Sequence, residues 1–360
     1  MIDLAGFCTP WLIFGLVLLL HLLLPAQRVR GYVRDPKTGE PLRYRLNGIF
    51  VLAATLGLWV LAGQQGWLPW DYLWTHRWGS LAGACTLGLL FTLVVVLPAR
   101  STGRSLLADL FFGRLENPQC LGGRVDVKMY LYLAGATMLA LNLLSFAAHH
   151  VMAHEGAISP GVLLHLGLFS WFLLDYLFFE RVHLYTYDLF AERVGFKLGW
   201  GCLTFYPYFY AVGLWSVADL GDPGAPRWLL LVATAVFFGG WCLARGSNMQ
   251  KFLFKLDPTH RFLGVFEPQV VTDGQRRLLC SGFWGISRHV NYLGEILMAT
   301  GLALALGRPE CIGPWLYPLY YVLLLVPRER DDHRRCAAKY GALWDEYCRR
   351  VPRRIVPGVY

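Results

Sequence analysis

Long apolar stretches alternate with short polar loops along the whole chain. A helix needs about 20 apolar residues to cross a bilayer, and nine stretches reach or approach that length. They lie near residues 9–25, 46–63, 81–98, 129–147, 159–180, 198–217, 227–244, 285–306 and 312–327. The pattern predicts an all-α fold, a polytopic transmembrane helical bundle of about nine spans.

Every second loop between these stretches is basic. The basic loops lie near residues 28–45, 100–128, 181–197 and 245–277, and they are followed by a basic tail from Arg328. Because cytoplasmic loops carry an excess of Lys and Arg, nine spans place the C-terminus in the cytoplasm and the N-terminus on the far side. The sequence contains no linker or obvious repeat, so residues 1–360 are predicted to form a single membrane domain.

The composition supports a membrane protein. Of the 360 residues, 56% are hydrophobic and 16% are charged, against about 25% charged in soluble domains. The net charge of +9 is spread over several loops, which argues against nucleic-acid binding. The nine cysteines form no CxxC pair and no Cys/His cluster, so we expect buried reduced thiols and no metal site. The first apolar stretch lacks the features of a cleaved signal peptide and is predicted to be retained as a span.

The first polar cluster on the predicted cytoplasmic side is RGSNMQKFLFKLDP, Arg245–Pro258. Lys251 and Lys255 are four residues apart, so on a helix they share a face. Two cations on one face suit a phosphate group. The plainer interpretation is a pair of basic residues that end a span and reach for the interface.

The second cluster is SGFWGISRHVNYLG, Ser281–Gly294. Its glycines permit close backbone approach, Trp284 offers a flat face, and Asn291 and Tyr292 offer polar groups. This set would suit a stacked heteroaromatic ring, although the G-x-G-x-x-G of soluble dinucleotide sites is absent. The alternative is a turn within an interfacial aromatic belt.

The third cluster is the tail, in which Asp332, Cys336, Lys339, Tyr340 and Tyr347 recur at roughly helical spacing. Its many arginines equally fit an amphipathic helix on an anionic membrane surface.

Ionisable residues within the predicted spans are costly and are therefore functional candidates. Asp175 and Glu180 lie in the fifth span, and Glu295 lies just inside the eighth. Tyr176 and Tyr208 add phenols at similar depth, although packing is the plainer role for any single tyrosine.

Together these motifs resemble the sterol reductase family, which includes the Δ14-, Δ7- and C-24 sterol reductases and the lamin B receptor. The similarity runs from about Leu24 to Tyr360. The matching segments are LRYRLNGIF, FFGRLENP, LGWGCLTFYPYFY, RGSNMQKFLFKLDP, LLCSGFWGISRHVNYLGE and DDHRRCAAKYGALWDEYCRRVPRRIVPGVY.

The resemblance implies a multi-helix membrane enzyme that binds NADPH in a cytoplasmic-side pocket, formed by a cofactor half at roughly residues 245–360, and receives a sterol or related polycyclic lipid from the bilayer. By position, the implied cofactor contacts are Lys251, Lys255, Leu279, Trp284, Asn291, Tyr292, Asp332, Cys336, Lys339, Tyr340 and Tyr347.

The substrate half departs from the family pattern. Cys202 replaces the usual acidic residue after Gly-Trp-Gly, Phe172 stands where tyrosine is common, and Val290 replaces a proline. The family's first span is also expected to be absent. Phe283 and the Leu-Gly-Trp-Gly at 198–201 lean toward the Δ7 enzymes, and Δ14 remains the other expected type.

An isolated alkene must be protonated before hydride can quench the resulting cation. A phenol holds its proton unaided at neutral pH, whereas a carboxyl group needs burial. The candidate acids are Tyr176 and Asp332, followed by Glu180 and Tyr208.

Two alternative functions belong to other classes of protein. Isoprenylcysteine and phospholipid methyltransferases share an Arg-His-x-x-Tyr-x-Gly run but use S-adenosylmethionine, and a silent sterol-binding homologue would keep the cofactor set without turnover. The compact chain suggests a bacterial inner membrane, or the endoplasmic reticulum in a eukaryotic host.

Overall fold

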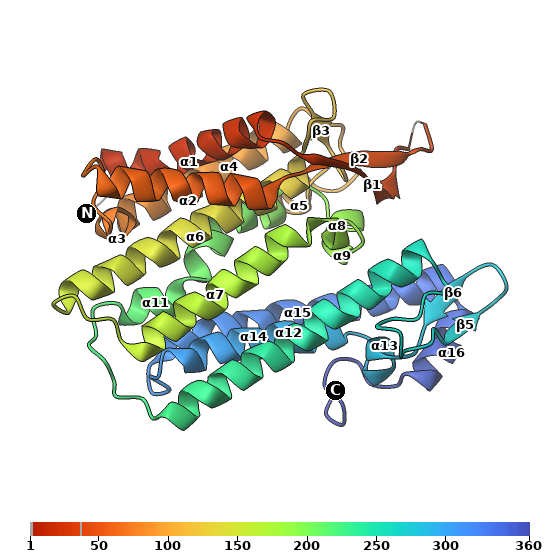
Figure 1. Cartoon of the computed structure of the whole chain (residues 1–360). Coiled ribbons are helices and arrows are strands. Elements are labelled where there is room, and N and C mark those ends of the chain that lie inside the picture. Colours follow the sequence, from red (N-terminus) through yellow and green to blue (C-terminus); the bar gives the residue numbers. More distant parts are fainter. Residues whose placement is uncertain (1–2, 37) are drawn as a thin grey trace. The chain divides into compact units, whose positions relative to one another are not determined.

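The computed structural model describes residues 3–36 and 38–360, and the chain forms two compact units. The first unit ends at Pro223 and the second is Gly224–Tyr360. Both are predominantly helical (Figure 1). The predicted cofactor half, roughly residues 245–360, lies within the second unit.

The first unit contains four long apolar helices, several short ones and two small hairpins. Its elements are α1 (Leu4–Leu23), β1 (Gln27–Arg34), β2 (Pro41–Leu46), α2 (Gly48–Gln64), α3 (Tyr72–Thr75), α4 (Arg77–Val96), α5 (Leu106–Phe112), β3 (Gln119–Cys120), β4 (Val125–Asp126), α6 (Val127–Ala153), α7 (Pro160–Phe178), α8 (Glu180–His183), α9 (Tyr187–Phe190), α10 (Phe196–Trp200), the π-helix η1 (Gly201–Phe209) and α11 (Val212–Val217).

Helix α6 forms the centre of the first unit. In the most apolar 18-residue stretch of α6, 83% of the residues are buried. At Gly135 a side chain would meet the backbone of Cys202 and the ring of Tyr206, so only glycine lets η1 approach this closely. The Asn142 amide also donates to the carbonyl of Pro207, at 2.9 Å. The π-helix is therefore fixed along its length against α6.

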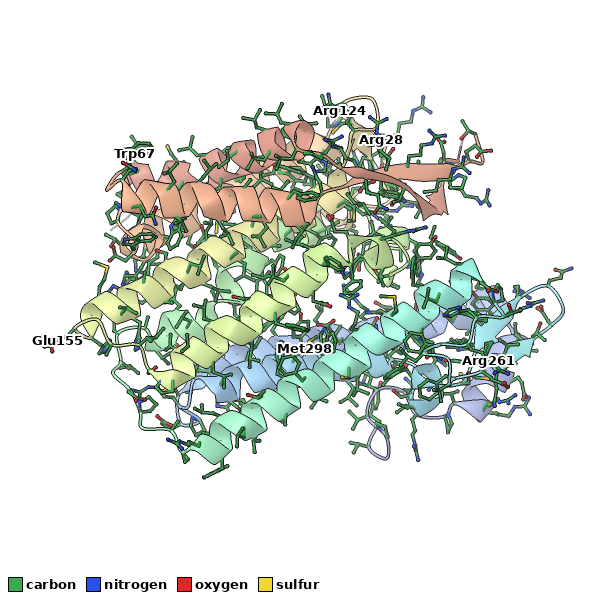
Figure 2. All side chains as sticks on the ribbon, in the orientation of Figure 1. Arg28, Trp67, Arg124, Glu155, Arg261 and Met298 are labelled. Atoms are coloured by element: carbon green, nitrogen blue, oxygen red, sulfur yellow. The ribbon has the colours of Figure 1, made fainter. Side chains whose placement is uncertain are left out.

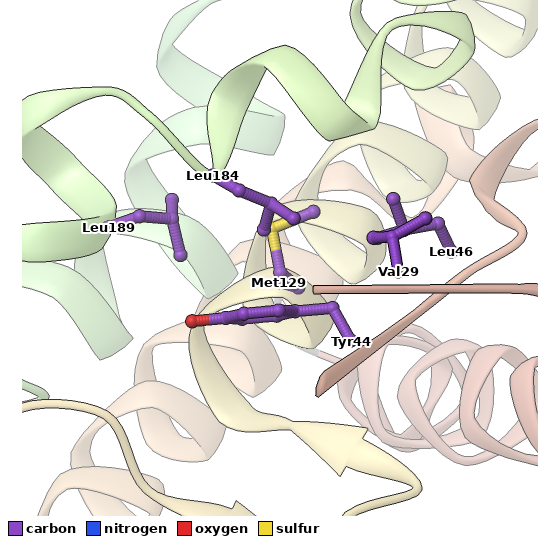
Figure 3. Packing of buried hydrophobic residues seen from close by; sticks show 6 residues of the cluster. All are labelled: Val29, Tyr44, Leu46, Met129, Leu184 and Leu189. Carbon is purple, nitrogen blue, oxygen red and sulfur yellow. The ribbon is translucent and has the colours of Figure 1, made fainter. Parts of the chain in front are cut away.

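The hairpin of β1 and β2 packs one face into the core of the unit. Val29, Tyr44 and Leu46 from the hairpin meet Met129 of α6 and the short helices α8 and α9 (Figure 3). A side chain at Gly31 would collide with the Tyr44 ring, so glycine is needed for this face to close. The opposite face of the hairpin carries arginines.

The second unit is built around two long helices that pack closely. Its elements are α12 (Arg227–Leu256), β5 (Val270–Thr272), β6 (Arg277–Leu279), α13 (Phe283–Ile286), α14 (Val290–Ala305), α15 (Ile312–Tyr340) and α16 (Ala342–Arg350). Gly240 of α12 and Gly294 and Gly301 of α14 line the seam between α12 and α14, and a side chain on any of them would meet backbone atoms of the other helix at 2.8 Å or less. Small residues at such a seam let two membrane helices approach closely.

The helices agree with most of the predicted spans. Within the described residues, five helices are long and apolar enough to cross a membrane: α1, α4, α6, α7 and α12. The shorter apolar helices α2 and α14 lie in two further predicted spans. The predicted span 198–217 is divided among α10, η1 and α11, and the ninth forms the first part of α15. The count of nine and the sidedness remain predictions.

Three details differ from the sequence analysis. The fold is not purely helical, because the described chain has three two-stranded antiparallel sheets. Helices α12 and α15 run past the predicted spans, to Leu256 and Tyr340. The cysteines are not generally buried, since only Cys202 and Cys280 are, while Cys8, Cys120 and Cys242 are exposed.

Candidate functional site

Two residues of the polar clusters singled out in the sequence, Lys251 and Trp284, meet where α12 ends and α13 begins. The Lys251 ammonium lies 5.2 Å from the centroid of the Trp284 ring, a cation–π distance. The Trp284 indole N–H donates to the Ser247 carbonyl, at 2.8 Å. This bond fixes the plane of the ring, so a cation and a flat aromatic face are presented together.

A glycine turn sets the position of Trp284. Gly282 has φ +60°, and a Cβ there would lie 2.4 Å from the Gln250 side-chain nitrogen. Gln250 is buried, donates to the Ser281 carbonyl at 3.1 Å and accepts from the Phe283 N–H at 3.0 Å. The close approach predicted for Gly282 is thus made to Gln250, which sequence reasoning did not select.

Asp332 of α15 lies close to His289 and Cys336. Its carboxylate is 3.7 Å from His289 Nε2 and 3.9 Å from the Cys336 thiol. Burial raises the pKa of Asp332, while the charges of Lys251 and Arg335 oppose that rise. Burial, with Lys251 and Arg288 adding to it, lowers the pKa of His289 to about 3. His289 is therefore neutral at pH 7, and its contact with Asp332 is not an ion pair there.

Two further predicted residues lie on the first turns of α14. Tyr292 is buried and its ring stacks on His289, with centroids 4.7 Å apart and planes 18° apart. The side-chain carbonyl oxygen of Asn291 is buried, and no hydrogen-bond partner for it lies among residues 3–36 and 38–360. Such an unpaired acceptor is costly in a folded protein and is suited to a donor on a bound ligand.

Three of the remaining predicted contacts, Lys339, Tyr340 and Tyr347, lie at or near the junction of α15 and α16. The Lys339 ammonium is 5.0 Å from the centroid of the Tyr340 ring, which Arg276 also approaches at 5.6 Å. Tyr347 is buried and stacks on Trp344, with centroids 5.0 Å apart. Leu279 pairs with Val270 in the β5–β6 hairpin, and Lys255 is exposed on the last turn of α12.

The structure adds a network around Arg288 that sequence reasoning missed. The Arg288 guanidinium donates to His333 Nδ1 at 3.4 Å and to the Cys348 sulfur at 2.7 Å. The Trp344 indole donates to the same His333 nitrogen, at 3.2 Å. Because Nδ1 accepts both bonds, the proton of neutral His333 lies on Nε2. The Arg288-His289 pair in the sequence motif could have pointed to this network. The partners of Arg288, however, come from α15 and α16.

A second missed network holds the C-terminal residues. Glu329 of α15 is fully buried and accepts from the Arg354 guanidinium and from the Tyr360 hydroxyl, both at 3.1 Å. The backbone N–H groups of Arg288 and His289 donate to the carbonyls of Arg353 and Arg354, respectively. The tail is thereby fixed against the segment that positions His289 and Asn291.

The other three acid candidates belong to the first unit. The Tyr176 ring at the end of α7 lies 4.0 Å from that of His183. Tyr208 of η1 is buried, and its hydroxyl is 2.5 Å from the Ser80 hydroxyl. Glu180 lies beyond the end of α7, on α8, and accepts the Gly48 N–H at 2.9 Å. Burial raises the pKa of Glu180 to about 7, with the Gly48 bond acting in the opposite direction.

The raised pKa of Glu180 predicts a pH-dependent stability. The folded pKa is about 7 against an ordinary value of 4.5, so the folded state binds more protons in that interval and loses stability as pH rises from about 4.5 to 7. Glu180→Gln keeps the acceptor for Gly48 and removes this loss. We expect the variant to exceed wild type in unfolding free energy by up to about 3 kcal/mol at pH 8 and to match it near pH 4.5.

The measurement is the thermal unfolding midpoint of purified protein in detergent across this pH range. Glu116→Gln is the matched control, because Glu116 is exposed and pairs with Arg193. Equal pH profiles for wild type and Glu180→Gln would show that folding does not raise the pKa of Glu180.

The apolar helices and the polar cluster at the end of α12 define a predominantly helical membrane protein. The chain belongs to the ergosterol biosynthesis ERG4/ERG24 family, whose family model matches residues 5–360. The family predicted from the motifs is confirmed. The match begins at residue 5 and therefore includes α1, whereas the similarity had been expected to start at about Leu24.

Similar proteins come from several kingdoms. The chain is 33% identical to the Delta(14)-sterol reductase of Arabidopsis thaliana, over 94% of this chain and 91% of that protein. It is 34% identical to the Delta(14)-sterol reductase TM7SF2 of Mus musculus, over 98% and 86%. It is also 33% identical to the Delta(14)-sterol reductase of the bacterium Methylotuvimicrobium alcaliphilum, over 89% and 76%.

Proposed function

We propose that this protein reduces a carbon–carbon double bond of a sterol or related polycyclic lipid, with NADPH as the hydride donor. The observation that carries the proposal is the similarity, over most of both chains, to proteins named Delta(14)-sterol reductase. A probable 7-dehydrocholesterol reductase of Acanthamoeba polyphaga mimivirus is less similar, at 27% identity. These similarities favour the Δ14 bond over the Δ7 bond.

The residues of the second unit fit a phosphorylated dinucleotide. Lys251 and Lys255 offer charge for phosphates, and the fixed Trp284 ring offers a stacking face. The buried Asn291 oxygen has no hydrogen-bond partner in the described part of the chain and suits an amide donor such as a carboxamide. When bound, NADPH supplies hydride to a carbon that has become positive.

The chain itself must supply the proton that precedes hydride transfer. Asp332 and Glu180 are the candidate carboxyl groups, and burial raises the pKa of both, which helps each to hold a proton near neutral pH. Tyr176 and Tyr208 are the candidate phenols. Aromatic rings near the acid would also stabilise a cationic centre.

The direct experiment supplies purified protein with NADPH and separate Δ14, Δ7 and Δ24 sterols. We expect a product two hydrogens heavier from the Δ14 sterol, with smaller or no conversion of the others, as measured by mass spectrometry. Asp332→Asn, Glu180→Gln, Tyr176→Phe and Tyr208→Phe are assayed beside wild type, and the true acid is the one whose loss reduces turnover on the order of 100-fold or more while NADPH binding persists.

Binding of S-adenosylmethionine to the purified protein is measured beside binding of NADPH. Binding of S-adenosylmethionine in place of NADPH would replace the proposal with methyl transfer. Binding of NADPH without reduction of any of the three sterols would contradict sterol reduction and leave a cofactor-binding homologue.

A further inference from the structure

Four arginines of the β1–β2 hairpin project from one face. The strands are antiparallel, with Arg28 opposite Arg45 and Arg30 opposite Arg43. Residues directly opposite in an antiparallel pair have neighbouring side chains on the same face of the sheet. The alternate positions Val29 and Tyr44 fill the core (Figure 3). Because side chains alternate between the two faces of a strand, the arginines face away from the core.

Two like-charged cross-strand pairs are unfavourable by themselves. Directly opposed like charges destabilise a sheet, and a two-stranded hairpin has little stability of its own. A register irregularity between Arg30 and Arg34 follows these pairs along β1. The two arginine pairs on this face of the hairpin therefore indicate a ligand of opposite charge.

One of the four arginines already has partners. Arg45 donates to the carbonyls of His21, Leu22 and Leu24 at the end of α1, at 3.0, 3.3 and 2.5 Å. Arg124 donates to the same Leu22 carbonyl, at 2.9 Å. Both cations thus stabilise the C-terminal end of the α1 dipole and add positive charge beside the hairpin. Figure 2 labels Arg124 and Arg28 on the first unit.

The other three arginines have no such partner. Within the described chain, the guanidinium groups of Arg28, Arg30 and Arg43 form no hydrogen bond or ion pair, and all three residues are exposed. They line a cavity of about 290 Å³ together with Val29. The hairpin's own acidic residues, Asp35 and Glu40, lie at its turn end.

The position of the hairpin indicates the source of the anion. β1 begins four residues after α1 ends, and β2 ends two residues before α2 begins. The helix α1 is apolar enough to cross a membrane and exposes Leu12, Leu19 and Leu23. The arginine face therefore lies beside a membrane-spanning helix end, at the level of lipid headgroups. We propose that Arg28, Arg30 and Arg43 bind the phosphate of an anionic phospholipid.

Guanidinium groups suit this ligand because each presents a fork of N–H donors to phosphate oxygens. The lipid's acyl chains would lie along the exposed apolar residues of α1 and α2. The site is distinct from the proposed cofactor contacts, all of which belong to the second unit. A bound anion also removes the repulsion between the cross-strand arginine pairs.

The test uses the full-length protein reconstituted in nanodiscs that contain phosphatidylcholine with or without phosphatidylglycerol. Native mass spectrometry is expected to show retained phosphatidylglycerol on wild type. Arg28→Gln/Arg30→Gln/Arg43→Gln should weaken this retention on the order of 100-fold, because three basic side chains near an anionic surface together contribute roughly 3 kcal/mol and every 1.4 kcal/mol is about tenfold in affinity. Arg100→Gln/Arg104→Gln/Arg261→Gln removes the same charge from other loops and should leave retention unchanged.

Three results would overturn the proposal. Wild type could show no preference for phosphatidylglycerol over phosphatidylcholine, or the hairpin and control variants could lose the lipid equally. Inorganic phosphate at equal concentration could also displace the lipid, which would indicate a site for a free anion.

The thermal midpoint of the hairpin variant in detergent should match or exceed that of wild type, because its like-charge pairs are gone. If the triple variant does not fold, Arg30→Gln alone carries the same comparison.

Discussion

Lys251→Met should weaken NADPH binding on the order of 10-fold to 100-fold and reduce reduction of the Δ14 sterol accordingly. The ammonium of Lys251 lies over the Trp284 ring and within the field of Asp332. A charge-assisted hydrogen bond to phosphate contributes about 1.5–3 kcal/mol, and every 1.4 kcal/mol is about tenfold in affinity. Quenching of tryptophan fluorescence by NADPH measures the dissociation constant directly.

The neighbouring lysine provides the matched control. Lys255 has the same charge on the same helix but is exposed, so Lys255→Met should have a smaller effect. The charge of Lys251 also opposes the rise in the Asp332 pKa. Its removal should therefore raise that pKa further and move any limb of the pH–rate profile that reports Asp332 to higher pH. Unchanged NADPH affinity in a folded Lys251→Met variant would place the phosphates elsewhere.

The sequence predicted the helices of this protein more readily than their ends. Hydropathy identified the apolar part of α12 but stopped the span at 244, whereas the helix continues to Leu256. The missing turns contain Ser247 and Gln250, which resemble loop residues in a hydropathy profile. Both are buried, and each bonds to the segment that carries Trp284, Ser247 through its backbone carbonyl and Gln250 through its side chain. Their role depends on residues more than 30 positions away and was not visible locally.

The β1–β2 hairpin was missed although its pattern was present. Arg28, Val29 and Arg30 alternate with period two, and so do Arg43, Tyr44 and Arg45, as a half-buried strand does. The arginines were counted as a basic loop, which they also are. The alternation would have predicted both the strands and the single face on which the charges lie.

The candidate cofactor residues came largely from the motif resemblance, and the structure brings Lys251 and Trp284 into contact. It also shows what positions their neighbours. His333 and Glu329 share α15 with Asp332, but their partners Arg288 and Tyr360 lie about 30 or more residues away in the chain. Spacing along one helix can be read from a sequence, whereas such contacts between segments cannot.

Gly240→Leu should disrupt the second unit. A Cβ at Gly240 would lie 2.6 Å from the Gly294 carbonyl oxygen and 2.7 Å from the Met298 nitrogen. These are backbone atoms of α14, so the two helices must separate to admit a side chain. Overpacking costs about 1–3 kcal/mol where side chains can adjust, and we expect about 3 kcal/mol or more here. The measurements are the thermal midpoint in detergent and the fraction of protein that binds NADPH.

A control variant at the adjacent residue, Gly239, distinguishes the packing effect from the other effects of a Gly→Leu substitution. Gly239 is exposed on the same helix, and a Cβ there would meet nothing within 4 Å. Gly239→Leu makes the same chemical change one position away and improves helix propensity by about 1 kcal/mol. It should therefore leave the midpoint unchanged or raise it. If both variants unfold at the same temperature, close glycine packing does not hold α12 against α14; a large loss at Gly240 alone shows that it does.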